Sequence, residues 1–169
     1  MPDKNEIKQT PEILAPAGNR ASFLAAIAAG ADAIYCGLKN FSARMEAKNF
    51  SLEELSKLTR LAHKNSVRVY VAFNSLLKGQ ELAGAGQTIE QLQKFVQPDA
   101  LIIQDLALVQ IARQAGYSGE LHLSTLANVS FGKALKTCAA IKGIDRVVIP
   151  RELNIDEIKI VAAACPDTL

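Results

Sequence analysis

Short apolar runs alternate with longer amphipathic stretches along the chain. In several runs the apolar side chains occupy successive positions rather than every second one, which is typical of parallel strands covered on both faces. Residues 67–73 are the clearest example, because three valines supply β-branched side chains for packing. The runs that predict strands are residues 13–15, 33–36, 67–73, 100–103, 121–123 and 147–149.

Helix start signals precede two of the amphipathic stretches. Ser51 and Glu54 have the spacing of a capping box, in which the Ser hydroxyl accepts a backbone amide and the Glu side chain reaches back. Asn154 and Glu157 repeat this spacing before the last stretch. The leucines that follow the first box along one side are Leu52, Leu55, Leu58 and Leu61. The pattern therefore predicts helices between the strands.

An Asp stands just before three of the predicted strands, at Asp32, Asp99 and Asp145. Asp in this place is typical of turn chemistry in a loop between a helix and a strand. The repetition indicates that three units of the chain are built alike.

Six β/α units joined by right-handed crossovers form either an open doubly wound sheet or a barrel. The glycine-rich residues 84–86 do not directly follow a strand, as a dinucleotide-binding fingerprint would. Polar residues recur where the strands end, which favours the barrel. We therefore predict an α/β fold: a parallel β/α barrel of the TIM type, incomplete, with about six β/α units.

A full barrel of this type takes about 250 residues, and the chain has 169. Residues 11–169 are accordingly expected to be the N-terminal portion of a barrel domain that is truncated. Residues 1–10 are polar and are expected to form an N-terminal arm.

The strand ends carry the candidate catalytic residues Asn74, Asp105, Arg151 and Glu152. Asn74 can orient a polar substrate, and Asp105 or Glu152 can serve as acid or base. Arg151, with Arg44, can hold a carboxylate or phosphate through two hydrogen bonds. The alternative is that Arg151 and Glu152 form an ion pair at the rim and that Asn74 closes a turn.

Four further residues are candidates for substrate binding. Lys39 and Arg44 lie in the long segment 38–50, which mixes cations, amides and phenylalanines in the manner of a loop that covers substrate. Ser124 follows the fifth strand, and His122 lies within it. The alternative for segment 38–50 is a solvated connector, and the alternative for His122 is a structural histidine.

Composition restricts the function classes. Hydrophobic residues make up 49% of the chain and the net charge is +2, which favours one globular domain over a disordered tail or a dedicated nucleic-acid binder. The polar first ten residues are unlike a secretory signal, and no stretch approaches the roughly 18 apolar residues that span a bilayer. We therefore expect no membrane association.

The cysteines and histidines do not form a recognisable reactive set. Cys36, Cys138 and Cys165 match no zinc or cluster spacing, so no metal site is predicted within this chain. Their odd number, without a signal peptide, favours a reducing compartment, and we expect a cytoplasmic location. Neither His63, predicted to be solvated on a helix, nor His122 has a Ser or Cys partner at a recognisable spacing.

Two segments near the start resemble the opening signature of peptidase family U32. Residues 11–19 read PEILAPAGN, and residues 30–37 read GADAIYCG. The resemblance continues through residues 42–44, 49–50, Asn74, 99–102 with Asp105, 122–124 and 147–153. The chain departs from the pattern at Leu126 and Glu46, where other members often carry Gln and a basic residue.

The resemblance implies a barrel-like N-terminal region. The family includes collagenase-like proteases of unassigned catalytic type, and proteins required for hydroxylating tRNA, rRNA and the ubiquinone ring. Several of these carry an iron–sulfur cluster. The resemblance places the family's Gly-Ser/Ala-x-Cys segment after the sixth helix, so we expect no cofactor in this chain and a possible cluster in the full-length protein.

Three functions remain open. The chain is the N-terminal fragment of a U32 peptidase that acts on peptides, or part of a protein for RNA or ubiquinone hydroxylation. In the third alternative it is a non-enzymatic half-barrel that needs a partner chain, because unpaired strand edges and uncovered core residues favour association. The fragment alone is expected to lack full activity.

Overall fold

The computed structural model describes residues 11–43, 48–166 and 169. Six strands form one parallel sheet in the order of the sequence, and a helix follows each strand. The strands are β1 Leu14–Ala17, β2 Ala33–Gly37, β3 Arg68–Phe73, β4 Ala100–Ile103, β5 Glu120–Leu123 and β6 Arg146–Val147. The helices are α1 Arg20–Ala28, α2 Leu52–Lys64, α3 Leu82–Gln91, α4 Ala107–Gln114, α5 Gly132–Ala139 and α6 Ile155–Ala163.

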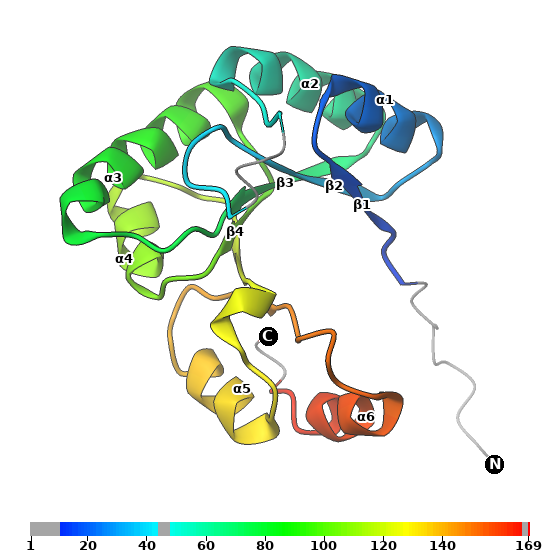
Figure 1. Cartoon of the computed structure of the whole chain (residues 1–169), viewed down its shortest axis with the longest axis vertical. Coiled ribbons are helices and arrows are strands. Elements are labelled where there is room, and N and C mark those ends of the chain that lie inside the picture. The colour runs from blue at the N-terminus through cyan, green and yellow to red at the C-terminus, as the bar shows by residue number, and fades with distance from the viewer. Residues whose placement is uncertain (1–10, 44–47, 167–168) are drawn as a thin grey trace.

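The elements form an arc. In Figure 1 the helices follow one another around the outside, the labelled strands lie toward the inside, and the arc is open between α6 and β1. Short turns of helix complete the connections: η1 Gly79–Glu81, η2 Leu92–Val96 and η3 Thr125–Ala127. The predicted fold class, an incomplete parallel barrel of about six units, is confirmed. The predicted arm, residues 1–10, lies outside the described residues.

The two faces of the sheet differ in composition. The apolar side chains that pack under the helices are Ile34, Cys36, Val69, Val71, Phe73, Leu101, Ile103, Leu121 and Leu123. A second, smaller cluster holds Tyr70 with Tyr35 and Ile102. Alternation along a strand assigns these two sets to opposite faces, so the second cluster belongs to the inner face of the arc.

Strand β6 is shorter than the predicted run 147–149. It pairs with β5 through residues Arg146 and Val147, and one further backbone bond joins Val148 N to Leu123 O at 2.9 Å. Pro150 has no backbone N–H with which to extend the ladder. Within the described part of the chain β6 has a strand on one side alone, as has β1.

The three repeated aspartates link neighbouring strands. Asp32 Oδ2 accepts the backbone N–H of Ile13 at 2.8 Å, just before β1. Asp99 does the same for Val69 at 2.7 Å, and Asp145 for Leu121 at 2.9 Å. These carboxylates therefore join β1 to β2, β3 to β4 and β5 to β6, rather than closing a turn within their own loops.

The helix caps follow the sequence signals with one difference. Asn154 forms a complete capping box with Glu157. Ser51 Oγ accepts the Glu54 amide at 3.2 Å, which is the half of the predicted box seen in the structure. Leu55 and Leu58 are buried, but Leu61 is exposed and Ala62 takes its place in the core.

No helix within the described residues is long and apolar enough to cross a membrane.

Candidate functional site

Three of the predicted site residues lie at the ends of neighbouring strands. Asn74 follows β3, Asp105 follows β4 by two residues, and Ser124 follows β5. Because the strands are parallel, these residues share the C-terminal edge of the sheet, which we call the mouth. This is the edge where barrel enzymes assemble their sites. The structure thus brings Asn74, Asp105 and Ser124 to one edge, and their catalytic and binding roles stay predictions.

Each of these side chains also bonds to the backbone. Asn74 Oδ1 accepts the N–H of Ala43 at 3.2 Å, across 31 residues of sequence. Asp105 Oδ1 accepts the N–H of Ala107 at 2.9 Å, and Ser124 Oγ accepts that of Leu126 at 3.3 Å. The mouth residues therefore fix the loops that surround them.

The loop after β2 is folded back onto the mouth. Residues Leu38 and Phe50 form a parallel bridge between its ends. The Phe41 ring stacks on Phe73 with centroids 4.8 Å apart, and Ser42 is buried. The described ends of the loop are therefore packed rather than forming a solvated connector. Lys39 is exposed at its start, and Arg44 lies outside the described residues.

Gly37 allows this loop to approach the strand. A Cβ at this position would lie 2.5 Å from Ser42 Oγ and 3.0 Å from Asn49 Oδ1, so a larger residue would force the loop outward. Two non-glycine residues among the described part of this loop have positive φ, Phe41 at 63° and Asn49 at 43°. Strain of this kind persists where the surrounding packing holds it.

Arg151 and Glu152 are not held at the mouth. Their side chains are 95% and 74% exposed, and Arg151 Nε lies 3.8 Å from Glu152 Oε1. This geometry matches the alternative of an exposed ion pair at the rim. Such pairs contribute little to stability. A catalytic role for either residue stays a prediction.

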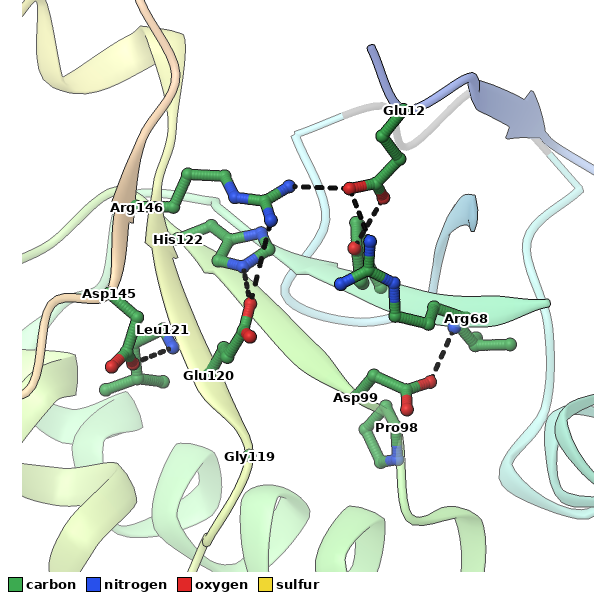
Figure 2. Close-up of polar contacts among 12 residues, drawn as sticks. Glu12, Arg68, Pro98, Asp99, Gly119, Glu120, Leu121, His122, Asp145 and Arg146 are labelled. Atoms are coloured by element: carbon green, nitrogen blue, oxygen red, sulfur yellow. Dashed lines mark hydrogen bonds and ion pairs between the residues drawn. The ribbon is translucent and has the colours of Figure 1, made fainter. Parts of the chain in front are cut away.

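A second polar group lies on the inner face, and His122 alone of its members was a candidate from the sequence. We call Glu12, Arg68, Tyr70, Glu120, His122 and Arg146 the inner network. Figure 2 shows the labelled Arg68 and Arg146 directed toward Glu12, which precedes β1. The Glu12 carboxylate accepts from Arg68 Nη2 at 2.6 Å, Tyr70 OH at 2.6 Å and Arg146 Nη1 at 3.3 Å.

Tyr70 and His122 form the centre of the inner network. The guanidinium carbons of Arg68 and Arg146 lie 5.7 and 5.8 Å from the centroid of the Tyr70 ring. The His122 ring stands edge-on to Tyr70 at 4.8 Å between centroids. Burial, followed by the hydrogen bond to Glu12, raises the pKa of Tyr70, so its hydroxyl stays a donor.

His122 is buried and bonds to Glu120, with Nε2 and Oε2 2.7 Å apart. Burial lowers the pKa of His122, although the hydrogen bond to Glu120 acts in the opposite direction. A neutral imidazole that faces a carboxylate carries its proton on the facing nitrogen. His122 is therefore a neutral donor to Glu120, consistent with the structural alternative for this residue.

The inner network is balanced in charge, with two guanidiniums against two carboxylates. Arg68, Glu120 and Arg146 are each the first residue of a strand, so the network lies at the end of the sheet opposite the mouth. In barrels this end contributes stability rather than chemistry. The sequence signal was the period-two repeat of a charged residue and a ring, at Arg68 and Tyr70 and at Glu120 and His122.

His63 lies on the exposed side of α2, as predicted, and it also bonds to a carboxylate. Its Nε2 lies 2.9 Å from Asp99 Oδ2, the carboxylate that also accepts the Val69 amide. The sequence did not indicate this partner, because it is 36 residues away and helix periodicity does not reveal it. Both histidines of the chain are thus bonded to carboxylates.

The thiols do not fit an iron–sulfur cluster, which needs several thiolates around one site. Cys36 is buried under the helices, and burial raises its pKa to about 12. Cys138 is buried in α5, whereas Cys165 is exposed after α6. No group of three or more His, Cys, Asp or Glu side chains suited to a metal occurs among the described residues.

Solved structures share this architecture. The U32 peptidase Mk0906 superposes with a TM-score of 0.74 at 13% identity, covering 98% of this chain and 70% of that one. DHDPS from Cyanidioschyzon merolae superposes with a TM-score of 0.51 at 14% identity, covering 86% of this chain and 52% of that one. The fold defines a class: the chain is a partial parallel β/α barrel of the TIM type.

The chain belongs to peptidase family U32, whose sequence profile matches residues 18–168. It is 36% identical to a collagenase of Porphyromonas gingivalis over 88% of the chain and 35% of that protein. It is 31% identical to tRNA hydroxylation protein P1 of Bacillus subtilis, over 92% of the chain and 36% of that protein. It is 34% identical to the 23S rRNA 5-hydroxycytidine C2501 synthase of Escherichia coli, over 94% of the chain and 23% of that protein. The chain spans about a third or less of these curated relatives.

Proposed function

We propose that this chain supplies the N-terminal part of the substrate-binding barrel of a protein that takes part in RNA hydroxylation. The observation that carries the proposal is the grouping of Asn74, Asp105 and Ser124 at one mouth. Amide, carboxylate and hydroxyl groups at adjacent strand ends suit the orientation of a polar ring such as a nucleobase. The relatives named for tRNA and rRNA hydroxylation support this substrate class.

The nucleophilic side chains of the described residues support the same choice. Peptide hydrolysis by a Ser or Cys nucleophile requires a hydroxyl or thiol beside a base. His122 and His63 instead face Glu120 and Asp99, and Cys36 keeps its proton. Action on cellular RNA also agrees with the cytoplasmic location that the sequence predicts.

Peptide hydrolysis is the second candidate, because the chain is 36% identical to a collagenase. One experiment separates the two. The gene product that contains this chain is expressed in a bacterium lacking its own U32 proteins, and RNA nucleosides are measured by mass spectrometry. The purified protein is then tested on gelatin.

Restored hydroxylated nucleosides without gelatin cleavage are the expected result. The variant Asn74→Ala should lower the hydroxylated fraction, whereas Gln114→Ala, exposed on α4, should not. Gelatin cleavage that falls in Asn74→Ala and not in Gln114→Ala would support the peptidase instead and overturn the proposal.

A further inference from the structure

A groove on the outer helix layer combines cations with an exposed aromatic ring. It is lined by Leu52, Glu53, Ser56, Lys57, Arg60 and Phe95, and we call it the α2–η2 groove. Its α2 side begins at the first turn of that helix, directly after the loop that folds onto the mouth. A polymer lying in the groove would therefore lead toward the mouth.

Phe95 is presented to solvent by the turn that carries it. Its side chain is 57% exposed, although its neighbours Leu92 and Val96 are buried. The five residues of η2 form a π-helical turn, a feature that occurs frequently at functional sites. Ser56 Oγ donates to the Phe95 carbonyl at 2.5 Å and fixes the turn against α2.

One cation lies over this ring, and a second is fixed in the groove. Lys94 Nζ lies 5.3 Å from the centroid of Phe95. Arg60 is held in the groove by Ser56, with Nε 3.2 Å from its carbonyl and Nη2 3.0 Å from its hydroxyl. Both bonds lie on the same edge of the guanidinium, which leaves its Nη1 edge for another acceptor.

One carboxylate accompanies these cations. Glu53 Oε1 lies 2.7 Å from Lys57 Nζ, and both side chains are at least 70% exposed. Exposed pairs of this kind contribute little, so a phosphate can replace Glu53 as the partner of Lys57. The groove lining thus holds two cations, Lys57 and Arg60, with one carboxylate, Glu53, and Lys94 lies beside it over the Phe95 ring.

We propose that the α2–η2 groove binds single-stranded RNA, with phosphates at Arg60, Lys57 and Lys94 and a base stacked on Phe95. A basic groove beside an exposed ring is the arrangement that binds single strands without sequence preference. RNA fits better than an acidic peptide, because every nucleotide carries both a phosphate for the cations and a base that can stack on the ring. This inference rests on the proposed function and names a surface outside the mouth.

The test measures binding of a fluorescent oligouridylate of about twelve nucleotides to the full chain by anisotropy. Phe95→Ser and Arg60→Gln should each weaken binding about tenfold. Arg60→Gln should also reduce the slope of log affinity against log salt by about 0.7, because one phosphate contact is lost. Both sites are exposed, and circular dichroism verifies folding.

The matched controls lie on another part of the surface. Phe131 is also 57% exposed, just before α5, and Lys136 is an exposed cation on that helix. Phe131→Ser and Lys136→Gln should leave binding unchanged. The inference is overturned if the wild-type chain does not bind, if control and groove variants behave alike, or if polyglutamate binds more tightly than RNA.

The outcomes also separate this inference from the proposed function. Binding that depends on Phe95 and Arg60, together with unchanged RNA nucleosides in the expression experiment, would leave the groove assigned and reject the hydroxylation role. Restored hydroxylation without binding in the groove would support the hydroxylation role and reject the groove as an RNA site.

Discussion

Glu12 holds together side chains from two strands that are distant in the sequence. It accepts hydrogen bonds from Arg68, Tyr70 and Arg146, the last of which lies 134 residues away. Its own side chain is 21% exposed, so its charge is partly removed from water. A carboxylate in this position neutralises two guanidiniums that would otherwise repel each other.

Replacing Glu12 with Gln should therefore destabilise the chain by about 1–2 kcal/mol, around the lower limit for charged hydrogen bonds, because both guanidiniums are partly exposed. Urea unfolding followed by circular dichroism measures the change. Glu90→Gln, on the exposed side of α3, is the control. An unchanged unfolding midpoint for Glu12→Gln would show that the inner network does not contribute to stability.

The burial of His122 gives the stability of the chain a pH dependence. Burial lowers its pKa below the ordinary value of 6.5, so protonation favours the unfolded chain. Stability from this residue is complete above about pH 6.5 and declines as the pH falls toward the folded-state pKa. The unfolding free energy should be lower at about pH 5.5 than at 7.5, and His122→Gln should flatten this difference. An imidazolium signal from His122 at neutral pH in an NMR titration would contradict the assignment.

At the scale of single elements, the loop after β2 depends on the strand that precedes it. Gly37 permits the close approach of Ser42 and Asn49, Phe41 stacks on Phe73, and Asn74 holds the Ala43 amide. These contacts bring a loop and two strand ends into one packed unit. The position of the loop over the mouth is thus decided by strand side chains rather than by the loop alone.

The variant Gly37→Ala should displace this loop and cost about 1–3 kcal/mol, the usual effect of overpacking. Trypsin should then cleave at Lys39 or Lys48 faster than in the wild-type chain. Gly79→Ala is the control, since nothing lies within 4 Å of the Cβ it would add. Equal cleavage rates in the two variants would show that the loop does not need the glycine.

The elements were largely predictable from the sequence, and their long-range contacts were not. Successive apolar positions and the caps at Ser51 and Asn154 indicated the strands and helices because these signals are local. The mouth was predictable because parallel strands align their ends. The bonds of Glu12 to Arg146 and of Asn74 to Ala43 depend on strand register and sheet curvature, which no local pattern encodes.

At the scale of the whole molecule, the arc has two strand edges and an uncovered last helix. Within the described residues β1 and β6 each pair on one side, and α6 exposes Ile155 at 65% and Ile160 at 69%. Unpaired strand edges and exposed apolar side chains favour association. The third function considered from the sequence, a half-barrel that needs a partner, depends on this surface.

We accordingly expect the isolated chain to self-associate as its concentration rises. Size-exclusion chromatography with light scattering should show the mass increasing, and Ile160→Lys should reduce the increase. Leu76→Lys, which changes an even more exposed apolar residue in a loop, should have little effect. A monomer at every concentration would show that the strand edges and the exposed side chains of α6 do not drive association.

The three thiols differ in burial, so their reactivity can be used to measure local unfolding of the chain. Cys165 is exposed, whereas Cys36 in β2 and Cys138 in α5 are buried. A thiol reagent should modify Cys165 at once and reach the other two when β2 or α5 separates from its neighbours. Mass spectrometry of the labelled chain then gives one labelling rate for Cys36, in the first half of the arc, and another for Cys138, in the second half. Labelling of Cys36 and Cys138 at the same rate would mean that the arc opens as a single unit.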